Sequence, residues 1–130
     1  MGKRHILVVD DEPNVLMTYR LILEMQGYQA TAAINSAEAR TALNAGGVDL
    51  LLCDLSLEKQ QNGFDVIGYG RSLDPGLPCA LLTGYASQDA NLWAEKNRVP
   101  ILFKPIDVKQ LLDTIRSLLS ARPAKKTMAS

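Results

Sequence analysis

Apolar positions along this chain follow two periods that alternate from one end to the other. Short apolar runs, typical of strands, cover residues 5–10, 28–34, 50–54, 79–83 and 100–103. After each run, apolar residues recur every three or four positions, as in amphipathic helices; these segments run from about residue 13 to 27, 35 to 46, 64 to 73, 87 to 97 and 107 to 120. The pattern therefore predicts a strand followed by a helix, five times over.

Residues with strong terminal preferences mark where these helices begin and end. Pro13 suits the first turn of a helix, and Asn35 and Asp107 are good helix caps. Gly27 and Gly46 suit helix ends. The last helix is expected to present one apolar face, made by Val108, Leu111, Leu112, Ile115 and Leu119.

Strict alternation of strands and helices indicates an α/β fold with a doubly wound parallel sheet and helices on both faces. Five strands favour the order 2-1-3-4-5 of flavodoxin-like folds, and the Ala-rich run at 28–34 is expected near a sheet edge. Residues 1–120 are expected to form one domain. Residues 121–130 lose the periodicity and are expected to be a tail or a linker stump.

Charge and composition narrow the choice of partners. The 14 basic and 14 acidic residues cancel, which removes any general electrostatic argument for direct binding to nucleic acid or to an anionic membrane. No apolar run is long enough to cross a bilayer, and no signal peptide precedes the first strand. Cys53 and Cys79 lie inside apolar runs and are expected to be buried, reduced thiols. We therefore expect a cytoplasmic protein.

Polar side chains follow four of the predicted strands, in the form of Asp10-Asp11, Asp54, Thr83 and Lys104. The carboxyl ends of parallel strands share one edge of the sheet, where ligands of α/β proteins bind. Three carboxylates in one crevice repel one another, so the cluster needs a cation or bound protons. A donor set of oxygens without His or Cys favours Mg²⁺.

The remaining polar groups suit a phosphoryl group. Lys104 brings a fixed positive charge and Thr83 a hydroxyl donor. The sequence has no glycine-rich phosphate loop, so the phosphoryl group is not expected to belong to a nucleotide. It is expected on the protein itself, with Asp54 as a carboxylate nucleophile that becomes an aspartyl phosphate.

The same residues carry a resemblance to a known family. Each motif alone is common as a helix cap or a strand exit, but four together at strand ends are specific. In this order and spacing they resemble the receiver domain of bacterial two-component response regulators; the motifs are Val8-Val9-Asp10-Asp11-Glu12, Asp54, Thr83-Gly84 and Lys104-Pro105. The resemblance extends from residue 5 to about residue 120.

The resemblance implies a signalling switch rather than an enzyme with a separate substrate. The domain would take a phosphoryl group from a histidine kinase or a histidine phosphotransfer protein and would slowly dephosphorylate itself. Its output would be a population shift on the face of the last two helices and the fifth strand. That shift would alter binding to a downstream output protein or the formation of a homodimer.

The resemblance also implies a role for each acid. Asp54 would be the phosphoacceptor and a ligand of Mg²⁺. Asp11 would bind the metal directly, and Asp10 would act mostly through water. The backbone carbonyl of Ser56 would complete the protein ligands.

Four further positions would bind the phosphoryl group or shape its pocket. Lys104 would bind a phosphoryl oxygen, and Thr83 would move to hydrogen-bond it after phosphorylation. The small Gly84 would leave the pocket open to a partner's phosphohistidine and to attacking water. Pro105 would follow a cis peptide bond.

Two features depart from the family pattern. Family members usually carry an aromatic residue three positions before the lysine, coupled to the threonine, and here that position is Ile101. Phe103 is adjacent to Lys104, so alternation is expected to point its ring to the opposite side of the strand from Lys104. The usual coupling between the threonine and an aromatic residue is therefore expected to be altered, which predicts a weaker or differently routed switch. The loop at residues 55–63 lacks the customary proline and is one residue longer than usual. Because this loop shapes the metal side of the expected site, it is expected to affect the lifetime of the phosphoryl group.

Three other functions are weaker candidates. A phosphate-independent interaction module with the same fold is favoured by Ile101 and the unusual loop, but the intact acids oppose it. A phosphatase with an Asp nucleophile wants a second acid two residues after Asp54, where Ser56 stands. A flavodoxin-type cofactor binder would need a phosphate-binding loop that the sequence lacks.

Overall fold

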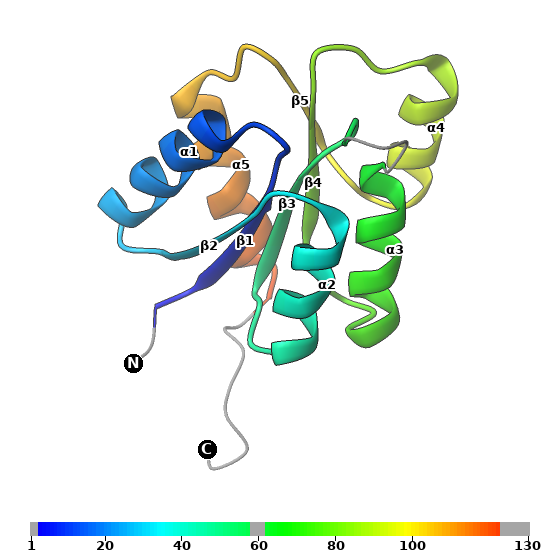
Figure 1. Cartoon of the computed structure of the whole chain (residues 1–130). Coiled ribbons are helices and arrows are strands. Elements are labelled where there is room, and N and C mark those ends of the chain that lie inside the picture. Colours follow the sequence, from blue (N-terminus) through cyan, green and yellow to red (C-terminus); the bar gives the residue numbers. More distant parts are fainter. Residues whose placement is uncertain (1–2, 58–61, 123–130) are drawn as a thin grey trace.

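The computed structural model describes residues 3–57 and 62–122, where five strands alternate with five helices (Figure 1). In chain order the elements are β1 (His5–Val9), α1 (Pro13–Met25), β2 (Gln29–Ala33), α2 (Ser36–Ala45), β3 (Leu50–Asp54), α3 (Gly63–Leu73), β4 (Cys79–Thr83), α4 (Gln88–Lys96), β5 (Ile101–Phe103) and α5 (Val108–Ser120). Every predicted strand and helix is present, with bounds close to the expected ones.

The strands form one parallel sheet in the predicted order, β2-β1-β3-β4-β5. The register aligns the ends of neighbouring strands. Val9 lies opposite Cys53, and Asp54 lies opposite Leu82. The residues that follow β1, β3, β4 and β5 therefore emerge side by side at one edge of the sheet.

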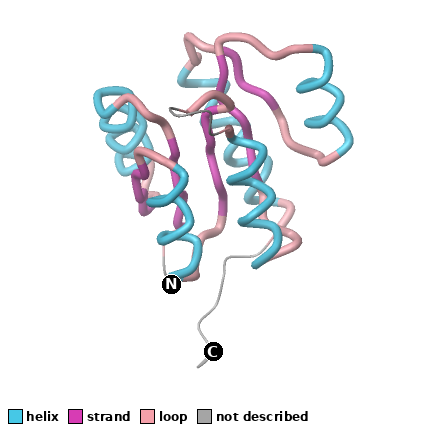
Figure 2. Tube along the Cα trace, turned by 45° about the vertical axis from the view of Figure 1, so that its right-hand side comes forward, coloured by secondary structure: helices cyan, strands magenta, loops and turns pink. Residues whose placement is uncertain are grey.

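Helices cover both faces of the sheet, with α1 and α5 on one face and α2, α3 and α4 on the other (Figure 1, Figure 2). Strand β3 is buried along its whole length because each of its faces meets a helical layer. Leu50 and Leu52 point toward the layer of α1 and α5, whereas Leu51 and Cys53 point toward the opposite layer. This double burial explains why the strand is apolar without alternation.

The helix ends confirm the predicted caps. Asn35 caps α2 by accepting a hydrogen bond from the backbone N–H of Glu38 at 2.8 Å. Asp107 caps α5 by accepting one from the N–H of Gln110 at 3.1 Å. Gly27 follows α1 with a φ of 91°, a left-handed conformation that favours glycine.

Four residues of the predicted apolar face of α5 are buried: Leu111, Leu112, Ile115 and Leu119. Val108 is exposed and lines a pocket beside α1 together with Leu111. Both cysteines are buried and free, as predicted. Burial raises the pKa of the Cys79 thiol to about 12 and also raises that of Cys53. None of the helices in the described ranges has the length and apolarity needed to cross a bilayer.

Arg122 fastens the end of α5 to the rest of the domain. Its Nη2 donates to both carboxylate oxygens of Asp74, at 2.9 and 2.7 Å. Its backbone carbonyl accepts a hydrogen bond from Arg4 at 2.9 Å. Arg122, the second residue of the expected tail, thus contacts the folded domain, and residues 123–130 lie outside the described part of the chain.

Two glycines of α3 make a matched test of the packing. Gly68 is exposed and a Cβ there would meet nothing within 4 Å, whereas a Cβ on Gly63 would stand 2.6 Å from the backbone oxygen of Asp54. We expect Gly68→Ala to stabilise the domain by about 0.5–1 kcal/mol through helix propensity. Gly63→Ala should destabilise it by roughly 1–3 kcal/mol because the backbone of β3 must shift. Urea unfolding measures both changes, and equal effects would contradict this account of the packing.

Candidate functional site

Three carboxylates converge at the carboxyl edge of the sheet, as predicted. Asp10 and Asp11 follow β1, and Asp54 ends the neighbouring strand β3. One oxygen from each of the three lies within 4.8 Å of the others. The exposed fraction is 0% for Asp10 and 6% for Asp54, so two of the acids are buried.

Lys104 joins two of these acids. Its Nζ lies 2.9 Å from Oδ2 of Asp54 and 3.0 Å from Oδ2 of Asp10. The residue follows β5, and its backbone N–H donates to the carbonyl of Thr83 at 2.7 Å. The peptide bond between Lys104 and Pro105 is cis, as the family resemblance implied.

Backbone N–H groups orient the same two carboxylates. Oδ1 of Asp10 accepts a hydrogen bond from the N–H of Glu12 at 3.0 Å, and Oδ1 of Asp54 accepts one from the N–H of Ser56 at 3.1 Å. Each buried acid therefore uses one oxygen for the ammonium and the other for the backbone, which fixes its orientation.

The charges at this edge do not balance. Burial raises the pKa of Asp54, although the hydrogen bonds from Lys104 and Ser56 act in the opposite direction. Burial disfavours the charged form of Lys104, but its bonds to Asp54 and Asp10 outweigh this, and its pKa is raised. One ammonium therefore faces three carboxylates. A divalent cation fits such an all-oxygen donor set and would offset the excess charge.

Thr83 is buried beside the acids, but its hydroxyl has other partners here. Oγ1 donates to the carbonyl of Tyr85 at 2.7 Å and accepts from the N–H of Tyr85 at 3.2 Å. These two bonds hold the turn that leads from β4 to α4. A Cβ added to the intervening Gly84 would meet nothing within 4 Å, so the space beside this position is open.

Phe103 lies on the same face of the sheet as Thr83 and Ile101. Thr83 pairs with Phe103, and Leu81 pairs with Ile101, so both residues of β5 share the face of their partners. Residues two apart in a strand point the same way, and only Leu102 between them turns toward α1 and α5. Ile101 packs on the layer of α2, α3 and α4. Phe103 is half-exposed and lies directly beside Thr83.

The loop after β3 closes at its base. Ser56 forms an isolated antiparallel bridge with Asn62, and the N–H of Gly63 donates to the carbonyl of Leu55 at 2.8 Å. Residues 58–61 belong to the loop at 55–63 that was expected to be one residue longer than usual, and they lie outside the described residues.

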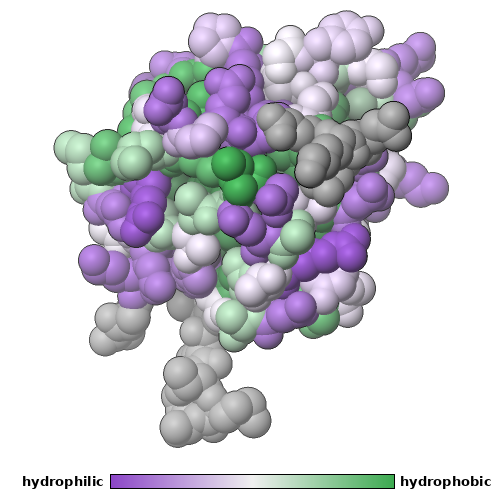
Figure 3. All heavy atoms as spheres, in the orientation of Figure 1, coloured by the Kyte–Doolittle hydropathy of each residue, from purple (hydrophilic) through white to green (hydrophobic). Residues whose placement is uncertain are grey.

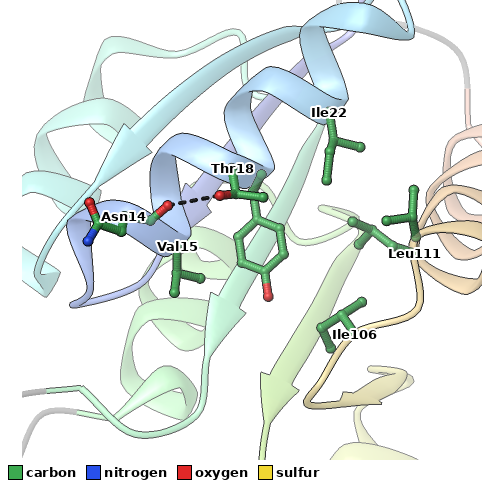
Figure 4. Close-up of a pocket in the computed structure, with 8 residues that line it drawn as sticks. Asn14, Val15, Thr18, Ile22, Ile106 and Leu111 are labelled. Atoms are coloured by element: carbon green, nitrogen blue, oxygen red, sulfur yellow. Dashed lines mark hydrogen bonds between the residues drawn. The ribbon is translucent and has the colours of Figure 1, made fainter.

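Tyr19 of α1 lies near the acids, which the sequence alone did not indicate. Burial raises the pKa of the Tyr19 hydroxyl, and among the nearby charges Lys104 lowers it while Asp10 and Asp54 raise it. Tyr19 also lines a pocket of about 320 Å³ between α1 and α5 (Figure 4). Its other lining residues are Asn14, Val15, Thr18, Ile22, Ile106, Val108 and Leu111. No motif marks this position, because Tyr19 follows the ordinary helical spacing of the core.

Comparison with known proteins agrees with this geometry. A family model described as "Response regulator receiver domain" matches residues 6–116. The chain is 32% identical over 116 residues to the transcriptional regulatory protein GlrR of Escherichia coli, covering 88% of this chain and 26% of GlrR. It is also 32% identical to a 14.6 kDa protein of Leptolyngbya boryana, with 95% of each chain covered. The chain thus spans about a quarter of the length of GlrR and nearly all of the second relative.

Solved structures agree as well. A CheY-like response regulator receiver domain protein from Methanospirillum hungatei superposes with a TM-score of 0.86 at 26% identity, covering 92% of this chain and 96% of that one. A response regulator receiver protein from Sinorhizobium medicae gives a TM-score of 0.81 at 30% identity, covering 93% and 98%.

The charge imbalance predicts that Asp54→Asn stabilises the metal-free domain. Because the pKa of Asp54 is raised, ionising its carboxyl group costs more free energy in the folded than in the unfolded chain. The folded state is therefore destabilised by the full difference at any pH above the raised pKa. We therefore expect the metal-free variant to melt above the wild type at neutral pH. Added Mg²⁺ should raise the melting temperature of the wild type more than that of the variant.

A second acid controls for the substitution itself. Hydrogen bonds from Lys109 and Arg116 lower the pKa of the exposed Asp113, so Asp113→Asn should not stabilise the domain. A metal-free Asp54→Asn variant that melts below the wild type would contradict the proposed imbalance.

Proposed function

Since the chain belongs to the response regulator receiver domain family, we propose that Asp54 is its phosphoacceptor. The observation that carries this proposal is the position of the Lys104 ammonium, 2.9 Å from Asp54 and 3.0 Å from Asp10. It provides a fixed positive charge beside a nucleophilic carboxylate, as transfer of a phosphoryl group requires.

In the proposed reaction, a carboxylate oxygen of Asp54 attacks the phosphorus of a phosphohistidine on the donor protein. A P–O bond forms, the P–N bond breaks, and the imidazole leaves with the electron pair and takes up a proton. The backbone N–H of Ser56 orients the carboxylate for attack, because it holds Oδ1 at 3.1 Å. Later attack by water on the phosphorus releases inorganic phosphate and restores the carboxylate. The domain acts on no other substrate in this proposal.

The acid cluster is the proposed Mg²⁺ site. Asp11 would bind the ion directly, Asp10 through water, and Asp54 together with the backbone carbonyl of Ser56 would complete the protein ligands. The argument that Mg²⁺ fits this site rests on the three converging carboxylates and on the single ammonium that faces them. When bound, Mg²⁺ supplies positive charge that reduces repulsion between these acids and the incoming phosphoryl group.

In the proposed switch, a change at Thr83 is transmitted to Tyr85 and Phe103. If the Thr83 hydroxyl turns to the phosphoryl group, its two hydrogen bonds to the backbone of Tyr85 are lost and the turn after β4 is released. Phe103 shares a sheet face with Thr83 and is half-exposed, so it can bury apolar surface in the space that opens. Ile101 sits deeper on the same face, where the family usually has its aromatic residue. Lys104 and Gly84 would complete the phosphoryl pocket.

The proposed phosphodonor is a histidine kinase or a histidine phosphotransfer protein. GlrR and AlgB of Pseudomonas putida, both named as transcriptional regulatory proteins, are longer than this chain, so an output protein or a homodimer is proposed to respond to the switch. The face that carries the output would be formed by α4, β5 and α5.

The decisive experiment is intact mass after incubation with acetyl phosphate. We expect a single phosphoryl adduct on the wild type that requires Mg²⁺ and is absent from Asp54→Asn. Lys104→Met should form the adduct at least tenfold more slowly, because the positive charge beside the transferred group is gone.

Gly68→Ala is a suitable matched control, because that glycine is exposed on α3 and has no role in the proposed site. It should react like the wild type. An adduct that persists in Asp54→Asn would refute the assignment of Asp54. No adduct on the wild type, with partner binding unaffected by Asp54→Asn, would favour the phosphate-independent interaction module.

Fluorine NMR can follow the proposed switch, because the chain has two phenylalanines. Phe64 stacks on Trp93 with ring centroids 4.4 Å apart and serves as the internal reference. With fluorophenylalanine incorporated, we expect phosphorylation to shift the Phe103 resonance and to reduce its broadening by a soluble gadolinium chelate. Thr83→Ala should keep the mass adduct and lose this response. An unchanged response in Thr83→Ala would show that Phe103 does not follow Thr83.

A further inference from the structure

The pocket between α1 and α5 has the size and the lining of a small-molecule site. Its volume is about 320 Å³, and small-molecule sites are mostly apolar hollows of roughly 300–1,000 Å³ that contain few polar groups. Helix α1 contributes Val15 and Ile22 to one wall, and Ile106 and Leu111 lie on the other (Figure 4). Green apolar side chains gather at the left edge of Figure 3, where α1 lies. The walls of the pocket are therefore suited to an apolar molecule.

The pocket combines buried and exposed lining residues. Leu111 and Tyr19 are 1% and 7% exposed, whereas Val108 is 45% exposed. Asn14 and Thr18 are exposed as well. The Thr18 hydroxyl donates to the backbone carbonyl of Asn14 at 3.0 Å, so it already has an acceptor (Figure 4). A molecule that enters the pocket would therefore pass a solvated rim and reach a buried floor.

The floor of the pocket contains a hydroxyl without a partner. Tyr19 lines the pocket, and its hydroxyl forms no hydrogen bond within residues 3–57 and 62–122. Buried tyrosine hydroxyls usually find a partner, because the hydrogen bonds to water that they lose otherwise cost free energy. Burial raises the pKa of this hydroxyl, so it stays protonated at neutral pH and can donate. A hydrogen-bond acceptor inside the pocket would give Tyr19 the partner that it lacks.

The charges around the pocket favour a neutral ligand. None of the described residues that line it is charged, so an ion bound there would lose water without a partner of opposite charge. The charges that act on Tyr19 are those of Lys104, Asp10 and Asp54. Because the two acids outnumber the lysine, this surrounding disfavours an anion in particular.

We infer that this pocket binds a small neutral molecule with an apolar body and one hydrogen-bond acceptor, to which the Tyr19 hydroxyl donates. The aliphatic walls remove the apolar body from water. A flat protein surface would cover the rim and leave the Tyr19 hydroxyl unpartnered, which favours a ligand that enters the pocket. The lining includes neither Lys104 nor a residue of the acid cluster, so the inference does not rest on the proposed phosphorylation.

Acetophenone is a suitable probe, because it joins an apolar ring to one carbonyl acceptor. In a titration of the metal-free domain followed by backbone amide NMR, we expect saturable binding with a dissociation constant on the order of 1 mM. The largest shifts should lie at residues 14–22 and 106–111. Val108→Trp should abolish this binding, because the larger side chain fills the pocket from its rim. Leu92→Trp is the matched control, since Leu92 is exposed on α4 and does not line the pocket.

Tyr19→Phe tests the hydrogen bond to the ligand. The variant should not melt below the wild type, because the hydroxyl has no partner to lose among the described residues. It should bind acetophenone roughly two- to tenfold more weakly. Toluene has no acceptor, so it should bind the wild type and the variant equally well, and the difference between the two probes isolates the hydrogen bond.

Two results would overturn the inference. The first is the absence of saturable shifts at the pocket, or shifts that persist in Val108→Trp. The second is a Tyr19→Phe variant that binds acetophenone like the wild type, or that loses affinity for acetophenone and toluene alike. Melting temperatures show whether each variant is folded.

Discussion

The candidate site depends on the ammonium of Lys104 held between two buried carboxylates. The buried carboxylates of Asp10 and Asp54 would repel each other, and the ammonium of Lys104, which contacts both, offsets this repulsion. The arrangement uses both oxygens of each acid, one for the ammonium and one for a backbone N–H. The remaining excess of negative charge suits a site that takes up a metal ion and a charged group.

The parallel sheet makes this meeting of side chains possible. Asp10, Asp54 and Lys104 are far apart in sequence, but each stands at the carboxyl end of a strand, and these ends lie at the same edge of the sheet. Because β3 is covered by helices on both faces, its last residue is carried into a buried position without further support from a loop. The same burial explains why the pKa of Asp54 is raised despite its two hydrogen bonds.

The sequence by itself determined the elements, their order in the sheet and the meeting of Asp10, Asp11, Asp54 and Lys104. Periodicity is a local property, and the rules for parallel sheets then bring polar strand ends to one edge. Only the tertiary structure decided which groups these side chains bond. The Thr83 hydroxyl bonds to the backbone of Tyr85, and Val108 is exposed whereas the other apolar residues on its face of α5 are buried. Such outcomes depend on distances between segments remote in sequence, which a residue pattern does not contain.

The position of Phe103 could be predicted only in part from the sequence. Alternation along β5 was sufficient to put Phe103 on the face of Ile101, opposite the adjacent Lys104. The register with β4 showed that it lies beside Thr83. Strand pairing is set by hydrogen bonds between distant segments, so a neighbour across the sheet is known only once the tertiary structure is known.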